Sequence, residues 1–520
     1  MPEQILQQKI YPHDGSFDAT KHPLLISYKD VVDSNNLIYT TYSTKKKRPG
    51  ISAAFKKRIP GDRPVLSGID FWRLGQQKVV VYNGLQIWAV DPETEAIDNI
   101  SQNFVIPEGN IVSFTAFQGL LIACFSDGVT SPKAWTQIGQ MTDLDATAPM
   151  GPFCRIWLNR VWMPDPSVPG RVLYSSTGTV SFVGGDAGAI DLDPNDDDPD
   201  GITAIFPPFF SNLYVTKRFS VYKIKPVVIS DGSIIFSPSK ISDGVGCVSH
   251  AAVAATPGNI FFPSDEGVHF FASTDKLSEI DTDEFSKEIS PLWQEETNFN
   301  RSQYIQGIYD KRLKSYVIAY PSFENDYPTD VWGFSIPAKK WYRWKDYDQT
   351  SLFKYTSSKT KRLQTIVGSK NGDIGIIDPT VTRDYDKPID ISFQSGIIAP
   401  SGSPDERYNF KAISPIFVPQ LSGNFDVTYR IDGRVIETMN FSMQDEDGGD
   451  ELAFEFVLGQ SFLGGMPRVK IDKRTLIGNG MLYEIYISHT GVGDDNDGFE
   501  MLGILMDLDR INKVIGRTVS

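Results

Sequence analysis

Residues 78–90, KVVVYNGLQIWAV, contain the pattern that decides the fold. Two runs rich in Val, Ile, Tyr and Trp, Lys78–Tyr82 and Leu85–Val90, flank the pair Asn83-Gly84. β-Branched and aromatic residues suit the pleated, half-buried surface of a strand. Asn-Gly favours a type I′ turn, because both central residues of that turn need a positive φ. The stretch therefore predicts a β-hairpin.

Similar units follow along the chain, whereas helical periodicity is scarce. Short apolar runs alternate with turns that contain Gly, Asn, Asp or Pro. Further strand pairs are predicted within residues 114–125, 154–163, 202–224, 259–271, 304–320, 331–344 and 363–377. This succession of short strands predicts an all-β protein.

The predicted hairpins recur at a spacing of roughly 30 to 50 residues, which is near the length of a four-stranded propeller blade. The equivalent positions are Val79, Ile111, Arg155, Thr203, Ala251 and Gln303. One blade has two apolar faces and buries both only between two neighbours in a closed ring. Residues 65–385 are therefore expected to form a β-propeller of about six blades, and the spacing also allows five or seven. A β-sandwich is the main rival fold for this region.

The two ends of the chain differ from this pattern. Residues 1–64 contain few periodic strands and a basic cluster, Lys45-Lys46-Lys47-Arg48, and they are expected to form an extended N-terminal arm that supplies a closing strand. Residues 386–520 contain about seven predicted strands, including Glu451–Leu458, and the hairpin turn Asp432-Gly433. This last region is expected to form a C-terminal β-sandwich.

Composition limits the function classes. The chain has 520 residues, a formal net charge of −15 and a pI of about 4.9, which argues against a protein that grips nucleic acid, because phosphate binding needs Lys and Arg. Cys124, Cys154 and Cys247 are far apart and form no CxxC pair, so reduced core thiols are expected, as in a reducing cytoplasm. The polar N-terminus predicts no signal peptide, and no apolar run is long enough for a membrane span.

Motifs of known chemistry are lacking, and the sequence predicts no catalytic, cofactor-binding or metal-binding residues. It contains no paired-His metal spacing, nucleophile elbow or phosphate-binding loop. The acidic run Asp191–Asp198 resembles the start of a calcium loop, but Asp196 and Ile202 occupy the positions of the required Gly and Glu. A solvated loop is the favoured interpretation, and a casual Ca²⁺ site stays open, as it does for Asp494–Asp497.

Two further groups could bind a partner. The basic cluster Lys45–Arg48 could contact DNA or an acidic protein, although a solvated arm or an interface within an oligomer is the favoured interpretation. Trp332, Trp341 and Trp344 could form a glycan-binding platform, but their strand context favours core packing.

Sialidases are propeller enzymes, so an enzymatic function would predict their sequence motif. Their repeated turn has the form S-x-D-x-G-x-x-W. Here Ser264-Asp265 and Ser126-Asp127-Gly128 place Asp directly after Ser, and no Trp follows at the required distance. The carboxylates of a glycosidase cannot be paired from sequence.

Several segments, in a shared order across residues 45–380, resemble the tail nozzle proteins of short-tailed bacteriophages, which are also called tail hub or head-stabilisation proteins. These proteins have an early Arg-Pro-Gly element, a W-x-N-R-x-W strand pair and a strand ending in Tyr-Ser. The matching segments are Arg48–Ile51, Trp157–Trp162, Val172–Ser175, Leu213–Ile224, Gly244–Ser249, Ile260–Val268, Trp341–Trp344 and Gly368–Ile374.

The resemblance implies a structural virion protein of a podovirus-like phage tail, folded in the host cytoplasm and without catalytic residues. It implies a homo-oligomer, a hexameric tube that prolongs the DNA exit channel below the portal and the adaptor (head-tail connector) ring. Tail fibres or spikes, a tail plug and exiting DNA are the further implied partners. Six copies would carry a summed charge of roughly −90, six times −15, so an acidic lumen would repel DNA. The alternative functions are a glycan-binding or glycan-cleaving propeller of the tail tip.

Overall fold

The computed structural model describes residues 7–11, 15–41, 43–193, 201–230, 232–256, 258–272, 285–400, 406–444, 469–492 and 497–511. Within these ranges the regular secondary structure is almost entirely β-strand. The helices described are α1 (Ser290–Glu296) and the 3-10 helices η1 (His250–Ala252) and η2 (Phe299–Tyr304). None of them has the length and apolar character that crossing a bilayer requires.

The chain divides into two compact units. One consists of Ala53–Gly333 and Lys345–Ile377, and it is called the propeller unit here. The other consists of Met1–Ser52, Phe334–Trp344 and Asp378–Ser520, and it is called the sandwich unit.

Seven small sheets follow one another between residues 67 and 378, each with its strands in chain order. The first three are β6 (Ser67–Arg73), β7 (Gln76–Tyr82), β8 (Ile87–Val90), β9 (Ile97–Asn99); β10 (Val112–Phe117), β11 (Leu120–Phe125), β12 (Lys133–Trp135), β13 (Thr142–Asp143); and β14 (Arg155–Trp157), β15 (Arg160–Pro164), β16 (Arg171–Tyr174), β17 (Gly188–Asp191). The fourth and fifth are β18 (Ala204–Ile205), β19 (Leu213–Thr216), β20 (Ser220–Val228), β21 (Ile234–Asp243); and β22 (Ala254–Ala255), β23 (Asn259–Pro263), β24 (Val268–Ala272). The sixth is β25 (Gln306–Asp310), β26 (Ser315–Tyr320), β27 (Asp330–Ser335), β28 (Lys340–Trp344), and the seventh begins with β29 (Gln349–Thr356), β30 (Leu363–Ser369), β31 (Ile374–Asp378). The boundary between the two units runs along β27.

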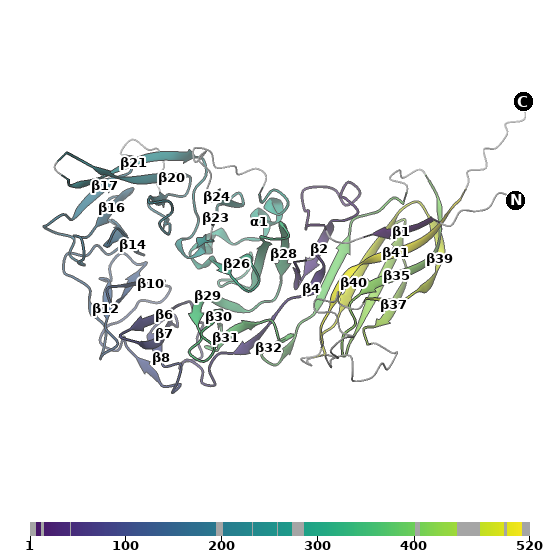
Figure 1. Ribbon diagram of the computed structural model, residues 1–520, viewed down its shortest axis with the longest axis horizontal. Coiled ribbons are helices and arrows are strands. Elements are labelled where there is room, and N and C mark those ends of the chain that lie inside the picture. Colours follow the sequence, from purple (N-terminus) through teal and green to yellow (C-terminus); the bar gives the residue numbers. More distant parts are fainter. Residues whose placement is uncertain are drawn as a thin grey trace, which may run out of the picture. The chain divides into compact units, whose positions relative to one another are not determined.

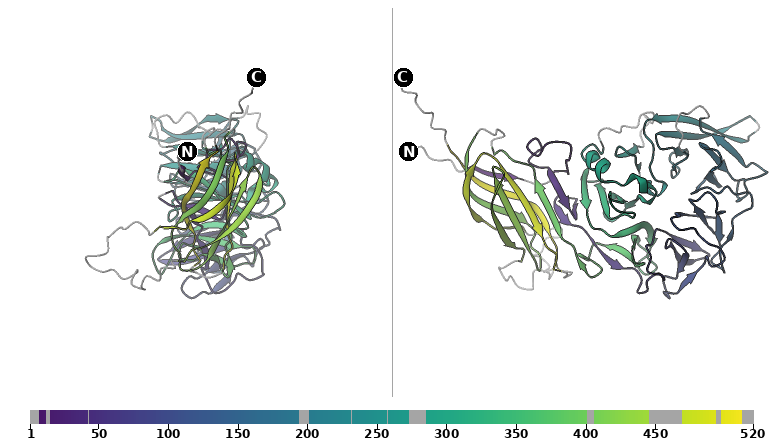
Figure 2. Two further views of the ribbon diagram at one scale, coloured as in Figure 1. Left: turned by 90° about the vertical axis from the view of Figure 1, so that its right-hand side faces the viewer. Right: turned by 180° about the vertical axis from the view of Figure 1, so that it is seen from behind.

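The sheets of the propeller unit close into a ring. The first strand of each sheet contacts its counterparts, so β6 touches both β10 and β29, and β25 touches both β22 and β29. The first and last sheets therefore meet, which is the closure that a propeller requires. Figure 1 shows the sheets around a common centre, and the right-hand view of Figure 2 shows the same ring from behind.

Apolar side chains fill the spaces between successive sheets. Trp162 and Val172 of the third sheet share a buried cluster with Leu213 and Val215 of the fourth. Val79 of the first sheet shares another with Ile366 of the seventh, and Phe55 and Ile59, which precede the first sheet, join that cluster. Each blade is thus buried between two others, as the sequence argument for a propeller required.

The described ring has seven sheets, one more than the predicted count of about six, and within the range that the spacing allowed. The sheet that was not counted begins at β29. The sequence of β29 is QTSLFKYT, in which apolar and polar residues alternate only weakly. Its first five residues, up to Phe353, are all buried, and Tyr355 is buried as well. A strand buried on both faces lacks the period-2 pattern on which strand prediction depends.

The sandwich unit contains two sheets. The first has the order β3 (Leu37–Tyr39), β4 (Lys45–Lys47), β41 (Glu500–Arg510), β35 (Tyr408–Phe417), β38 (Lys470–Ile471), with β1 (Gln7–Tyr11) beside β41 and β39 (Arg474–Gly480) beside β35. The second has the order β2 (Val31–Asn35), β34 (Ile391–Ser395), β40 (Tyr483–His489), β36 (Asn424–Ile431), β37 (Arg434–Ser442). In addition, β5 (Gly50–Ala53) pairs in parallel with β32 (Arg383–Asp384), which pairs with β33 (Lys387–Pro388).

The two sheets pack face to face through aromatic side chains. Phe417 of β35 lies 5.1 Å from Phe425 of β36, and Phe410 of β35 lies 5.6 Å from Tyr483 of β40, both as ring-centroid distances. Five of the predicted C-terminal strands reappear as β35, β36, β37, β40 and β41. The predicted strand Glu451–Leu458 lies outside the described residues.

The N-terminal region differs from the expected arm of residues 1–64. The strands β1 to β4 are members of the two sandwich sheets: β1, β2 and β4 pair with strands of the C-terminal region, and β3 pairs with β4. From Ala53 onward the chain belongs to the propeller unit, where the backbone N–H of Ala54 donates a 2.8 Å hydrogen bond to the carbonyl of Ile374. Strand pairing across more than 350 residues of sequence leaves no local signal, so the sequence could not predict it.

Candidate functional site

The W-x-N-R-x-W segment, Trp157–Trp162, forms the hairpin between β14 and β15. Leu158 and Asn159 have φ values of 48° and 57°, as a type I′ turn requires. The carbonyl of Asn159 accepts a 2.7 Å hydrogen bond from the backbone of Gly178, and its side-chain oxygen accepts one of 3.1 Å from Gln118. The turn is therefore tied to the loop of its own sheet and to the preceding sheet.

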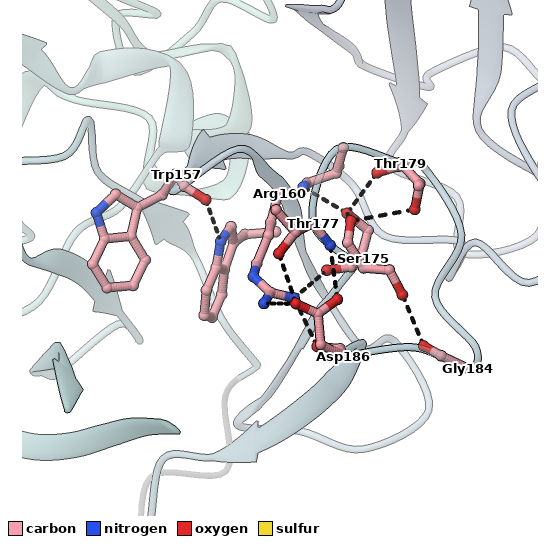
Figure 3. Close-up of polar contacts among 10 residues, drawn as sticks. Trp157, Arg160, Ser175, Thr177, Thr179, Gly184 and Asp186 are labelled. Carbon is pink, nitrogen blue, oxygen red and sulfur yellow. Dashed lines mark hydrogen bonds and ion pairs between the residues drawn. The ribbon is translucent and has the colours of Figure 1, made fainter. Parts of the chain in front are cut away.

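Arg160 follows this turn and is buried. Its Nη1 donates hydrogen bonds to the carbonyls of Ser175 (2.9 Å) and Asp186 (2.7 Å), and its Nη2 forms an ion pair with the Asp186 carboxylate. Figure 3 shows the guanidinium between these groups. The rings of Tyr174 and Phe236 lie 5.3 and 5.7 Å from the guanidinium carbon. Arg160 thus joins a turn, a strand and a loop through one planar group.

Asp186 also fixes the loop that connects β16 and β17. It accepts hydrogen bonds from the backbone N–H (2.9 Å) and the hydroxyl (2.7 Å) of Thr177. These two bonds, helped by the Arg160 guanidinium, lower the pKa of Asp186 to about 2. The Ser175 hydroxyl donates to the carbonyl of Thr179 at 2.8 Å (Figure 3). Because these side chains are used within the blade, the segment that resembles phage nozzles has an architectural role here.

We expect Arg160→Met to lower the free energy of unfolding by about 2–3 kcal/mol, because it leaves two carbonyl acceptors without their charged donor. The matched control is Arg171→Met in the same sheet, whose partner Asp191 is half exposed, so this substitution should change stability far less than Arg160→Met. Denaturant unfolding gives both values, and hydrogen exchange should show faster exchange in residues 176–186 for Arg160→Met only. Equal effects of the two substitutions would contradict this role.

The centre of the propeller ring contains a cavity of about 300 Å³. All seven sheets, or the residues just before them, contribute to its wall. The lining residues include Ile111, Arg155, Thr203, Ala251 and Gln303, which are five of the six positions that the sequence analysis had matched between blades. The repeat that the sequence predicted is thus the set of inner-strand positions around the axis.

Arg155, His250 and Tyr304 are the ionisable residues in the wall of this cavity. The Nε of Arg155 donates a 3.0 Å hydrogen bond to the carbonyl of Ile205, and burial lowers the pKa of Arg155 to about 10. The His250 ring stacks on Phe153 at 4.1 Å and 6°. Burial, together with the charge of Arg155, holds the pKa of His250 well below its usual value. Neither Arg155 nor His250 was assigned a role in a site from the sequence, because their position on the axis depends on ring closure.

The basic cluster of the N-terminal region is mostly buried, which corrects the expectation of a solvated arm. Lys45, Lys47 and Arg48 are 1%, 3% and 2% exposed, and Lys46 is exposed. Lys45 lies over the rings of Tyr39 (5.2 Å) and Phe393 (5.6 Å). These three cations therefore stabilise the sandwich unit and are not available for DNA or an acidic partner.

Lys47 belongs to a buried charge cluster. Its Nζ lies 3.1 Å from Oδ2 of Asp497 and also donates to the carbonyl of Asp497 at 3.0 Å. The other carboxylate oxygen lies 2.8 Å from Nε2 of His489, in a poorly aligned contact, and Nδ1 of His489 donates to the carbonyl of Asn424 at 2.7 Å. Both ring nitrogens of His489 therefore lie against oxygen atoms of this cluster. Burial would raise the pKa of Asp497, but the contacts with His489, the Val492 N–H and Lys47 prevail and lower it to about 2.

Arg48 of the Arg-Pro-Gly element contacts residues that are distant from it in the sequence. Its guanidinium forms a two-pronged ion pair with Asp384, and its Nε donates to Oδ1 of Asn36 at 3.0 Å. It also lies 5.7 Å from the ring of Trp344. At Gly50, an added Cβ would overlap the backbone of Arg383, so this close approach requires glycine.

The remaining predicted groups have structural positions. Among the described residues, no three His, Cys, Asp or Glu side chains gather as metal ligands, and residues 194–200 and 493–496 of the two acidic runs lie outside the description. Asp191 pairs with Arg171, and Asp497 is in the cluster above. The three cysteines are buried free thiols. Trp332, Trp341 and Trp344 are fully buried, which contradicts a glycan platform at these positions.

Comparison with known proteins found matches among solved structures. No protein-family model matches the chain, and no curated protein matches its sequence. Among solved structures, similar chains occur in the crystal structure of the Mitotic Checkpoint Complex (10% identity, 63% of this chain and 99% of that chain, TM-score 0.38) and in YCF48 from Cyanidioschyzon merolae (11%, 64% and 99%, TM-score 0.37). PorZ of Porphyromonas gingivalis is also similar (10%, 74% and 46%, TM-score 0.38). Similarities of this size carry no inference about the function of the chain.

Proposed function

We propose that the chain is a structural subunit of a phage tail nozzle of the podovirus type. The observation that best supports this proposal is the structural role of the segments that resemble such proteins. Arg48 of the Arg-Pro-Gly element is held by Asp384, and Arg160 of the W-x-N-R-x-W hairpin is held by Asp186. Both motifs fix the path of the backbone, and neither presents a reactive group. Such motifs suit a building block whose function depends on shape.

In this function six copies would form a ring by heterologous contacts around one axis. The ring would prolong the DNA exit channel below the portal and the adaptor ring, and it would anchor tail fibres or spikes and accept a tail plug. The net charge of −15 per chain suits a lumen that DNA passes without adhering. The protein would be part of the virion after folding in the host cytoplasm.

Native mass measurement of the purified chain, alone and with the adaptor-ring protein of the same virion, tests the proposal. We expect a ring of six copies, either spontaneously or on the adaptor, because nozzle contacts form during assembly. A chain that stays monomeric in both samples would overturn the proposal. A screen on sialosides and bacterial polysaccharides in parallel would then distinguish a glycan-binding protein from a glycan-cleaving enzyme.

A further inference from the structure

The axial cavity contains a positive charge that no acidic side chain compensates. Within the described residues, the hydrogen bond from Arg155 Nε to Ile205 is the contact that its guanidinium makes, and it has no carboxylate partner. The residues that line the cavity include no Asp or Glu. Arg155 is half-buried, and removing a cation from water without a counter-charge is costly, so its position at the centre of the ring suggests a ligand that supplies the missing charge.

The His250 ring adds a directed donor to the same wall. Its Nδ1 accepts a 3.2 Å hydrogen bond from the backbone N–H of Ile205, so the ring hydrogen of the neutral tautomer lies on Nε2. The stack on Phe153 fixes the plane of the ring. Nε2 has no protein acceptor among the described residues, and Ser67 Oγ, another group of the cavity wall, is buried without a hydrogen-bond partner.

The surroundings of the cavity strengthen the positive potential. Lys354 lies two residues beyond the lining residue Leu352 on β29, so the two side chains share one face of the strand. Lys354 is an exposed residue, but its side chain is partly desolvated, and this desolvation, together with the charges of Lys311 and Arg155, lowers its pKa. Arg155 and Lys354 therefore place two positive charges near the cavity of a chain whose net charge is −15. The sign of this region is opposite to that of the whole chain.

We infer that the axial cavity binds a small phosphate-type dianion, with two oxygens on the Arg155 guanidinium and a third on His250 Nε2–H. The planar fork of arginine matches two oxygens of a tetrahedral oxyanion, and two positive charges favour a dianion over a monocarboxylate. A volume of about 300 Å³ is at the lower end for ligand pockets. It suits inorganic phosphate or the phosphoryl group of a small metabolite and excludes duplex DNA. The inference does not depend on the proposed nozzle function.

Calorimetric titration of the full chain with inorganic phosphate, and separately with glycerol phosphate, tests this site at constant ionic strength with chloride as the balancing anion. We expect saturable binding of one ion per chain in at least one of the two titrations, and competition by sulfate. Arg155→Gln should weaken binding roughly 10- to 100-fold, as the loss of charge-assisted hydrogen bonds implies, and Arg155→Lys should have an intermediate effect. The matched control is Arg171→Gln, an arginine of the same sheet that Asp191 already neutralises, and it should leave binding unchanged.

A second variant separates ligand binding from folding, because Arg155→Gln also removes the hydrogen bond to Ile205. Lys354 is exposed and its side chain makes no hydrogen bond in the described structure, so Lys354→Gln should weaken phosphate binding several-fold without changing the thermal midpoint. If neither phosphate nor glycerol phosphate binds saturably at millimolar concentration, the inference is overturned. It is equally overturned if Arg155→Gln and Arg171→Gln affect binding to the same extent.

Discussion

Lys47→Met is expected to lower the free energy of unfolding of the sandwich unit by about 3–5 kcal/mol. The substitution keeps most of the apolar volume of the side chain but removes the ammonium group that pairs with Asp497. The Asp497 carboxylate would then be buried without its lysine partner, and its contact with His489 is poorly aligned. An uncompensated buried charge costs far more than a lost surface pair, which is why the expected effect is large.

The adjacent Lys46 provides the matched control. It precedes Lys47 in the same strand but is exposed, so Lys46→Met should change stability by no more than about 0.5 kcal/mol. Because the chain has two units, the change is best localised by hydrogen exchange in β40 and β41. The double variant Lys47→Met, Asp497→Asn should recover part of the loss, since it removes both charges together. If the double variant is as unstable as Lys47→Met, the ion pair is not the cause.

The same cluster gives a pH dependence of known sign. Asp497 has a pKa of about 2 in the folded protein, whereas an unfolded Asp has a pKa of about 3.9. The contribution of Asp497 is therefore present above about pH 4 and is lost as the pH falls towards 2. Lys47→Met should weaken this acid sensitivity, because Lys47 is one of the groups that lower the pKa of Asp497.

The basic cluster shows where sequence reasoning failed and which signal was present. Four consecutive basic residues were interpreted as solvated, yet the strand places Lys45 and Lys47 on one side and Lys46 on the other. Alternation with period two is the property of any strand, and it would have allowed buried positions. What the sequence could not predict is the partner, because Asp497 lies 450 positions later in the chain. Burial of a cation is decided by such partners and by rings such as Tyr39.

The propeller was predictable because its evidence is local and repeated. The hairpin turn Gln118-Gly119 of the second sheet has two positive φ values. The Asn83-Gly84 turn differs, because Gly84 alone has a positive φ, and the Asn83 side chain accepts hydrogen bonds from Leu85 and Gln86. The two strands still pair as predicted, because the flanking apolar runs set the pairing. The sequence predicted only the set of equivalent blade positions that line the axial cavity. The positive charge of the cavity results from ring closure, which brings these positions together.

Trp162→Ala is expected to lower the free energy of unfolding of the propeller unit by about 3–5 kcal/mol. The Trp162 side chain is fully buried, and its ring lies 5.3 Å from Trp157, 4.8 Å from Tyr174 and 4.9 Å from Phe236. These rings are themselves wedged between two blades, so they cannot collapse far into the space that the indole leaves. The indole N–H also donates a 3.1 Å hydrogen bond to the carbonyl of Trp157. Trp162→Phe, which keeps a ring but loses this bond, should have a smaller effect.

The matched control for this substitution is Trp72→Ala, because Trp72 is 42% exposed on β6 and should cost no more than about 1 kcal/mol. Thermal and denaturant unfolding measure both effects. The cluster of Trp162 includes Leu213 and Val215 of the neighbouring blade, so hydrogen exchange should become faster in β19 as well as in β15. Faster exchange in β15 alone would mean that the indole stabilises its own hairpin without coupling the two blades. The ring of sheets would then depend on its inner strands more than on the apolar layer between them.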